Sequence, residues 1–307
     1  MAYLVKKRIK NKDYYYLVAS VKLAGRIKKF QLYIGAKRPF RKQLTKLKDV
    51  LNKRIESYMS KFDPFLTLLT EREKNELEAI KKSYKKTLSP AVKQNYYEWF
   101  LTNYTYDTNA IEGSTLTLRE TAMVLFEGVT PYNRPLRDVR AAENHKKAYD
   151  WMMNYKHDLS VQFILRLHKI MTSEILSPSE SGKFRRVQVY IRGASDVPPP
   201  PHVVKWQLMK LLSWYKSNKK RYHTTVVAAK MHAEFERIHP FVDFNGRTGR
   251  LLLNFILFKT GYPPIDIRNK DKQHYYEAIR NATGGNIKPL VKLIERYLKE
   301  ATPNNKT

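Results

Sequence analysis

The spacing of apolar side chains divides the chain into a short N-terminal stretch with strand periodicity and a long remainder with helical periodicity. Tyr3–Val5, Tyr14–Val21 and Phe30–Ile34 are aromatic or β-branched and are separated by polar turn segments. Short strands joined by such turns predict a three-stranded meander, which Gly35 ends. We therefore expect a small β-rich module over residues 1–43.

Helical spacing begins at Leu44 and continues almost to the end of the chain. Residues 44–84 predict a helical connector that breaks at Asp63-Pro64 and is hairpin-like. Ser89 is a suitable N-cap for a helix that continues to about Ala110. Thr117 and Glu120 form a capping box that should open a helix over 117–127. Further helices are expected over 138–155, 160–173, 203–218, 225–238, 246–260, 269–281 and a final stretch ending near Glu300. The fold class is therefore mainly α, a helical bundle.

One segment inside the helical region breaks this periodicity. From Gly182 to Ile191 apolar and polar side chains alternate, and the segment then meets Gly193 and the Pro198–Pro201 run. The alternation is too short for a domain of its own, so it predicts a lone β-hairpin packed on the bundle.

Net charge sets the N-terminal module apart. The chain carries 58 Lys and Arg against 28 Asp and Glu, and residues 1–61 carry 18 against 3, a net +15 of the total +30. Basic residues interleaved with exposed tyrosines suit a nucleic-acid backbone with bases stacked on the rings. A solvated sheet whose lysines protect its edges would show the same pattern, so both interpretations stay open.

Composition also excludes several classes of protein. There is no cysteine, which excludes disulfides and thiolate metal sites. No apolar run is long enough to span a membrane, and the N-terminus lacks an apolar signal core. We therefore expect a soluble cytoplasmic protein without a membrane partner.

The densest group of candidate functional residues follows the helix that ends at Ile238. His239-Pro240 should end that helix, because a residue before proline disfavours the α region. Gly246 and Gly249 flank Arg247 at the start of the next helix, where free backbone N–H groups and the helix dipole favour an anion. Arg247 and Arg250, three residues apart, share one face of that helix. This arrangement predicts a polyphosphate site, with Asp243 as a hard oxygen ligand for Mg²⁺ and His239 as a base that titrates near neutral pH.

The segment resembles the motif of the Fic (filamentation induced by cyclic AMP) family, His-Pro-Phe-x-Asp/Glu-Gly-Asn-Gly-Arg-x-x-Arg. The resemblance implies a Fic domain over residues 85–300 that transfers AMP from ATP to a Ser, Thr or Tyr hydroxyl of a target protein. It implies His239 as general base, Asp243 as the Mg²⁺ ligand, and Arg250 at the terminal phosphate. Asn245, Gly246, Arg247 and Gly249 would then form the phosphate and ATP site.

Three further features acquire a role from this resemblance. Thr108 to Gly113 match the family's inhibitory signature, which implies that Glu112 pairs with Arg250 and competes with a phosphate. The predicted hairpin would be a flap that docks the target by strand addition, through Val187, Gln188, Val189, Tyr190 and Ile191. Tyr275, Tyr276 and Asn281 would line the adenine side.

Phe244 departs from the family pattern, because glycine usually stands at that position. A bulky residue does not easily adopt φ > 0 or permit close phosphate approach. The departure favours transfer of another phosphate-containing group, or a nucleic-acid-binding regulator with a degenerate site. An ordinary backbone with Phe244 packed outward would leave activity intact. The motif also does not separate AMP transfer from AMP removal.

The expected organisation is a basic module (1–43), a connector (44–84), the Fic domain with its inhibitory helix (85–300) and a disordered tail (301–307). The oligomeric state is not readable from the sequence, and a homodimer stays open.

Overall fold

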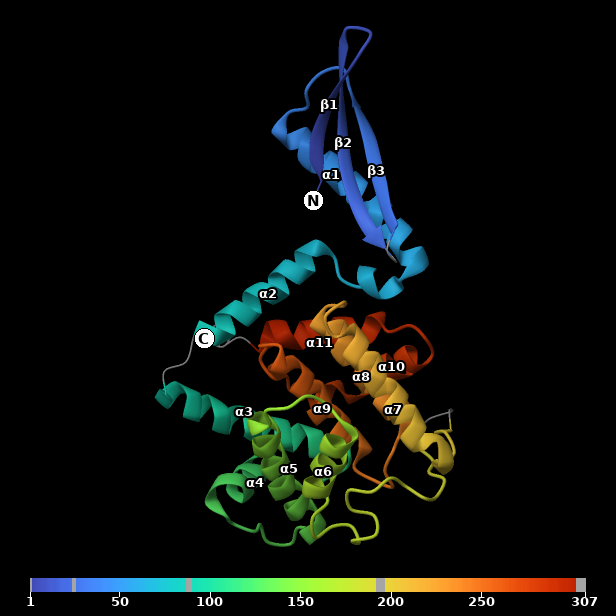
Figure 1. Ribbon diagram of the computed structural model, residues 1–307. Helices are drawn as coiled ribbons and strands as arrows, with labels where there is room; N and C mark the ends of the chain where they lie inside the picture. The colour runs from blue at the N-terminus through green and yellow to red at the C-terminus, as the bar shows by residue number, and fades with distance from the viewer. Residues whose placement is uncertain (1, 24–25, 87–89, 192–196, 302–307) are drawn as a thin grey trace. The chain divides into compact units, whose positions relative to one another are not determined.

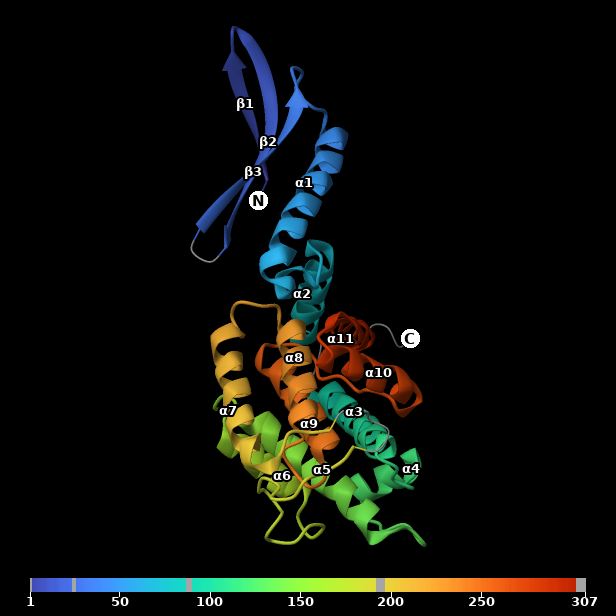
Figure 2. The same cartoon turned by 90° about the vertical axis from the view of Figure 1, so that its right-hand side faces the viewer.

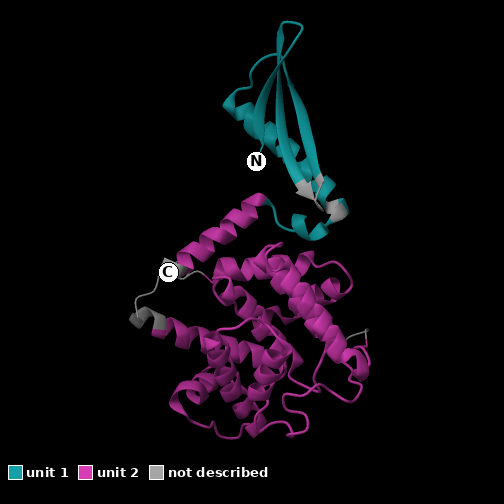
Figure 3. Cartoon of the chain, viewed as in Figure 1, with its two compact units in different colours: residues 1–70 teal, residues 71–307 magenta. Residues whose placement is uncertain are grey.

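The computed structural model describes residues 2–23, 26–86, 90–191 and 197–301. The chain divides into two compact units, residues Met1–Thr70 and Glu71–Thr307 (Figure 3). The predicted N-cap Ser89 and tail residues 302–307 lie outside the described residues.

Unit 1 is a three-stranded antiparallel sheet with one long helix packed on it (Figure 1). The strands are β1 (Tyr3–Ile9), β2 (Lys12–Leu23) and β3 (Arg26–Gly35), in that order across the sheet. Helix α1 (Arg41–Phe62) buries Leu51 against Leu17 and Ala19 of β2. The predicted meander is therefore present, and a helix completes its core.

The boundary between the units differs from the expected one. A one-turn 3-10 helix (Pro64–Thr67) follows α1, and the break at Asp63-Pro64 separates α1 from α2 (Glu71–Lys86). The first helix of the predicted connector belongs to the sheet, because its Leu44, Leu47, Leu51 and Ile55 pack on the strands. The second helix belongs to unit 2.

Unit 2 is a helical bundle, which confirms the predicted mainly α class. Thr117 and Glu120 form the predicted capping box, and the helix they open continues as a π turn (Met123–Glu127) up to the left-handed Gly128. No described helix is both long and apolar enough to cross a membrane. The remaining helices are α3 (Pro90–Ile111), α4 (Leu118–Ala122), α5 (Leu136–Asn154), α6 (Val161–Met171), α7 (Pro201–Asn218), α8 (Thr224–Ile238), α9 (Asn245–Lys259), α10 (Lys272–Thr283) and α11 (Lys288–Glu300).

Helices α8 and α9 form the centre of the bundle (Figure 2). Every residue of α9 from Arg247 to Leu257 is buried, and α8 is buried along most of its length. A helix that is shielded all round belongs to the core of a domain. The loop between these two helices carries the predicted phosphate motif, so two deeply buried helices hold it in place.

The predicted β-hairpin is wrong for the described residues of this segment. Gly182–Ile191 and 197–200 contain no strand. Val187 and Tyr190 are 59% and 76% exposed, so the alternating side chains have no apolar layer to cover them. The buried guanidinium of Arg185 instead donates to the carbonyls of Val187 and Pro199, so a side chain holds the two arms together.

Candidate active site

The loop between α8 and α9 contains two residues in the left-handed conformation. His239 ends α8 with φ 49°, and Phe244 precedes α9 with φ 62°. The Asn245 side chain closes the loop, because its Oδ1 accepts from the Phe241 N–H and its Nδ2 donates to the Phe241 carbonyl, both at 2.9 Å. Asn245 is buried, so its side-chain amide shapes the loop, and its part in the expected phosphate site would be played by its backbone at the start of α9.

The His239 ring is oriented by the last turn of α8. Its Nδ1 lies 3.2 Å from the Glu236 carbonyl, which can only accept, so Nδ1 carries the proton and Nε2 has a free lone pair. Burial lowers the pKa of His239 below its ordinary value, with the neighbouring Glu236 carbonyl opposing that shift. The imidazole is therefore neutral at pH 7, the form that a general base requires.

Two residues outside the motif hold this loop, and neither is among the site residues expected from the sequence. Arg185 donates from Nε to the His239 carbonyl at 2.8 Å, and its backbone N–H donates to Pro240. His168 accepts from the Gly182 N–H and donates to the Asp243 carbonyl at 3.1 Å, and its ring stacks on Phe241. Such contacts join segments far apart in the chain, so no local pattern indicates them.

Phe244 keeps the left-handed backbone that glycine usually provides at this position. Its ring is 2% exposed and packs inward, where the Arg247 guanidinium carbon lies 3.4 Å from the ring centroid. Both alternatives considered from the sequence, a lost φ > 0 and an outward ring, are therefore wrong. A guanidinium over an aromatic ring is a favourable pair, and it helps to offset the ~1–2 kcal/mol that the left-handed conformation costs.

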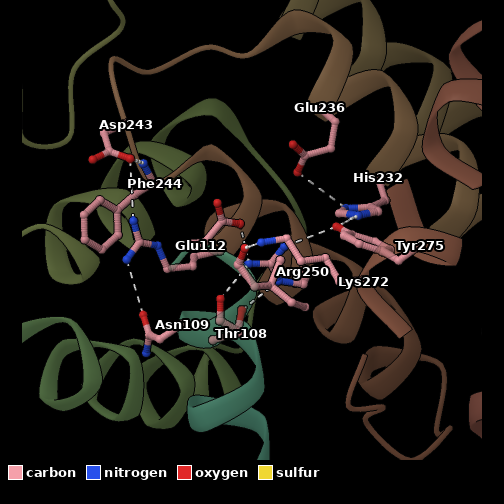
Figure 4. A network of polar contacts seen from close by, with 12 residues as sticks. Thr108, Asn109, Glu112, His232, Glu236, Asp243, Phe244, Arg250, Lys272 and Tyr275 are labelled. Carbon is pink, nitrogen blue, oxygen red and sulfur yellow. Dashed lines mark hydrogen bonds and ion pairs between the residues drawn. The ribbon is translucent and has the colours of Figure 1, made fainter. Parts of the chain in front are cut away.

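All three nitrogens of the Arg250 guanidinium are bound, by the end of α3, by Glu112 just after it and by α10 (Figure 4). Its Nε donates to the Thr108 hydroxyl at 2.7 Å, and Nη2 donates both to the Thr108 carbonyl and to Glu112 Oε1, the latter also at 2.7 Å. Nη1 reaches the Tyr275 hydroxyl at 3.3 Å. The expected pairing of Glu112 with Arg250 is thus confirmed as a contact.

Glu112 occupies the position at the start of α9 that the sequence predicts for an anion. A Cβ added to Gly246 would lie 2.4 Å from Glu112 Oε1, so only glycine leaves room for this carboxylate. Burial alone would raise the pKa of Glu112, but the positive charges of Arg250 and Arg247 outweigh it and lower the pKa. The carboxylate is therefore charged at neutral pH.

The comparisons with known proteins agree with this geometry. Residues 158–257, which run from just before α6 into α9, match the sequence profile of the Fic/DOC family. The chain belongs to the Fic family through this domain. The protein adenylyltransferase Fic of Drosophila ananassae is 33% identical over 217 residues, which are 67% of this chain and 41% of that protein. The chain therefore spans less than half the length of this relative.

Solved structures show the same fold for the Fic domain. A Fic domain containing signalling protein from Bacteroides thetaiotaomicron has a TM-score of 0.68 and 26% identity, covering 74% of this chain and 93% of that one. Fic-1 from C. elegans, residues 134–508, has a TM-score of 0.69 and 24% identity, covering 83% of this chain and 75% of that one. At 24% identity, the likeness to the C. elegans protein concerns the fold alone.

The two glycines of the Fic motif make room for different residues. Gly246 faces the Glu112 carboxylate, whereas a Cβ on Gly249 would lie 2.3 Å from Glu236 Oε1 and 3.1 Å from the His232 ring. Gly249 therefore allows α8 and α9 to approach closely, and the structure does not direct it towards the anion position.

Asp243 is half-exposed beside the Fic loop and has two cationic neighbours. Its Oδ2 contacts Arg137 of α5, and its Oδ1 lies 3.5 Å from Arg247 Nη2. An exposed carboxylate suits Mg²⁺, which commonly takes one or two carboxylates together with substrate phosphates and water. No group of three or more metal-ligating side chains occurs among the described residues. A metal at Asp243 would therefore depend on the phosphates of a bound nucleotide.

The three residues expected on the adenine side are not brought together. Tyr275 is buried, and its hydroxyl pairs with His232 and Arg250. Tyr276 packs beside it, with ring centroids 5.4 Å apart. Asn281 donates to the Glu277 carbonyl and lines a separate hollow between α10 and α11. The structure thus links Tyr275 and Tyr276 with the Fic motif and leaves Asn281 apart.

A buried carboxyl group lies behind the anion position. Glu236 Oε1 is 4.0 Å from His232 Nδ1 and has no hydrogen-bond partner among the described residues (Figure 4). Burial raises the pKa of Glu236 to about 8, with Arg250 opposing and Glu112 adding to that shift. Glu236 is therefore largely protonated at neutral pH and adds little negative charge to the site.

Proposed function

We propose that the Fic domain transfers AMP from ATP to a hydroxyl group of a target protein. The observation that carries this proposal is the carboxylate of Glu112 at the start of α9, bound at 2.7 Å to Arg250. A carboxylate held there by an arginine marks a place built for an anion at a helix N-terminus. The name of the Drosophila ananassae relative supports adenylyl transfer as the reaction.

His239 would accept the proton of the target hydroxyl at Nε2. The hydroxyl oxygen then forms a bond to the α-phosphorus, the bond from that phosphorus to the β-phosphate oxygen breaks, and pyrophosphate leaves with the electron pair. The neutral ring and the fixed Nδ1–H contact with Glu236 support this role. Catalysis would rest mainly on positioning and charge stabilisation.

The first turn of α9 would hold the phosphates. Its free backbone N–H groups and Arg247, which remains charged because its pKa is about 10 even after burial, supply positive potential around Gly246. Arg250 would bind the terminal phosphate once Glu112 leaves it. Mg²⁺, held by Asp243 after Arg137 moves aside, would supply charge neutralisation on the α- and β-phosphates.

Glu112 would act as an autoinhibitory residue. Thr108 and Glu112 lie one helical turn apart at the C-terminal end of α3, and Gly113 follows with φ 94°. The carboxylate is 29% exposed on its side-chain surface, so it has a route out of the site without unfolding the core. Its displacement would free Arg250 for the nucleotide.

The segment Val187–Ile191 would dock the target chain. Its described residues form no strand, and Val187 and Tyr190 are exposed. An extended segment that is not already part of a sheet can accept a peptide by strand addition. Arg185 would couple the docked peptide to His239, because it binds the carbonyls of both Val187 and His239.

The reaction is tested with Glu112→Gly protein given Mg²⁺ and ATP labelled at the α- or the γ-phosphate in parallel. We expect protein labelling from the α-phosphate alone, because AMP keeps that phosphate. Glu112→Gly with His239→Ala added is the matched control and should give no label.

Other outcomes identify the rival reactions. Label from the γ-phosphate would show phosphate transfer. Loss of AMP from an adenylylated target, with no incorporation, would show the reverse reaction. No label from any nucleotide donor would show a degenerate site.

A further inference from the structure

The sheet of unit 1 has one face that α1 does not cover. Leu17 and Ala19 of β2 point to α1, so the alternating residues Tyr14, Tyr16, Val18 and Ser20 point to the opposite side, where Val18 alone of the four is buried. The strand register places Lys7 beside Tyr14, Tyr33 beside Tyr16, and Lys29 beside Ser20. We call this side, represented by Lys7, Lys12, Tyr14, Tyr16, Lys29 and Tyr33, the open face.

The open face carries positive charge without acidic neighbours among the described residues. Residues 1–35 contain nine Lys and Arg and a single acid, Asp13. Asp13 alternates with Tyr14 and therefore lies on the α1 side of the sheet, where it pairs with Lys6 at 2.7 Å. The ammonium groups of the open face thus have no carboxylate to neutralise them within the sheet.

The tyrosines of the open face pack against one another and against a lysine. The Tyr33 ring lies 5.3 Å from Tyr16 and 6.3 Å from Tyr14, and the Lys7 ammonium lies 4.8 Å over the Tyr16 ring. Single strands bind through bases stacked on free ring faces. Here the Tyr16 ring already lies under an ammonium group and beside Tyr33, which leaves less ring surface for base stacking.

We propose that the open face is a binding surface for duplex DNA. Strands can enter a groove of a duplex, where ammonium and hydroxyl donors meet phosphates and base edges. Lys12 and the partner of Lys29, Ser20, are eight positions apart on β2. That separation is roughly 26 Å, so the lysines meet different phosphates of a polymer that carries one charge per ~1.7 Å of its axis. This proposal does not depend on the reaction of the Fic domain.

The test compares two sets of charge changes in the full-length protein. Lys7→Gln, Lys12→Gln and Lys29→Gln together remove three charges from the open face. Lys42→Gln, Lys46→Gln and Lys53→Gln remove three charges from exposed positions of α1 and form the matched control. All six lysines are exposed, so both variants should fold, which melting temperatures check.

Binding to a fluorescent duplex of about 20 base pairs is measured over a range of salt concentrations. The open-face variant should bind about 100-fold more weakly at ~0.1 M salt, and its slope of log affinity against log salt should shrink by about two to three units. The control should stay within about threefold of the unmodified protein. Equal loss in both variants, no loss in the open-face variant, or tighter binding to a single strand of the same length would overturn the proposal.

Discussion

At the scale of single residues, Phe244 departs from the Fic motif, and the structure shows that its backbone keeps the left-handed conformation of glycine. The residue accepts a left-handed backbone because its buried ring packs against the Arg247 guanidinium. The sequence showed the motif and the departure from it. The sequence did not show the contact between the Phe244 ring and Arg247, because that contact depends on the side-chain conformation of Phe244.

Phe244→Gly should therefore destabilise the protein, although glycine is the usual residue in the family. Loss of a buried phenyl ring costs ~3–5 kcal/mol, and relief of the left-handed strain returns ~1–2 kcal/mol, so we expect a net loss of about 2–3 kcal/mol. Urea unfolding measures this change. Phe244→Ala, which loses the ring but keeps the strain, should be about 1 kcal/mol less stable again. A Phe244→Gly protein as stable as the original would show that the ring contributes nothing.

Glu236 should make stability depend on pH. Its pKa is raised from 4.5 to about 8 in the folded protein by burial. Between these values the folded chain holds a proton that the unfolded chain has released, so stability falls as pH rises through that window. Glu236→Gln, which cannot ionise, should lose this dependence, a difference on the order of a few kcal/mol between pH ~5 and ~8.

Glu234→Gln on the same helix is the control for that measurement. Glu234 pairs with Lys230 and Arg237, and its pKa is lowered, so its contribution is lost only as pH falls below the ordinary glutamate range. Its difference from the unmodified protein should be flat from pH ~5 to ~8. An identical pH dependence in the unmodified protein and Glu236→Gln would contradict a protonated Glu236.

At the scale of elements, local signals in the sequence predicted the helices well and the segment 182–191 badly. Proline after His239, the capping box at Thr117 and glycine at position 128 act within a few residues, and the structure shows each of them. The hairpin failed because alternation alone does not supply an apolar layer, and Arg185 takes the carbonyls instead. The apolar stripe of α1 could be seen in the sequence, but the sequence did not show that this stripe packs on the sheet.

The same limit explains which site residues were missed. Arg137, His168 and Arg185 reach the Fic loop from three segments distant in the chain. No local pattern in the sequence indicates these contacts. In contrast, Glu112 could be predicted because a specific signature marks it, and the structure brings it to Arg250.

At the scale of the whole molecule, two units carry two separate proposals. Unit 2 holds a buried arginine, Arg250, whose three nitrogens all bind to α3, Glu112 or Tyr275, so nucleotide and Glu112 would compete for the same group. Unit 1 carries +14 over residues 1–70, with 18 Lys and Arg against four Asp and Glu, and would bring the domain to DNA. Neither proposal requires the other.

The most direct test of the central claim is the rate of AMP incorporation from α-labelled ATP in the unmodified protein, Glu112→Gln and Glu112→Gly. Removing a charge-assisted contact worth ~2–3 kcal/mol should raise the rate about 30- to 100-fold in Glu112→Gly. Glu112→Gln, which keeps the size but not the charge, should give a smaller rise. Equal rates in all three proteins, each abolished by His239→Ala, would show an active site that Glu112 does not restrain.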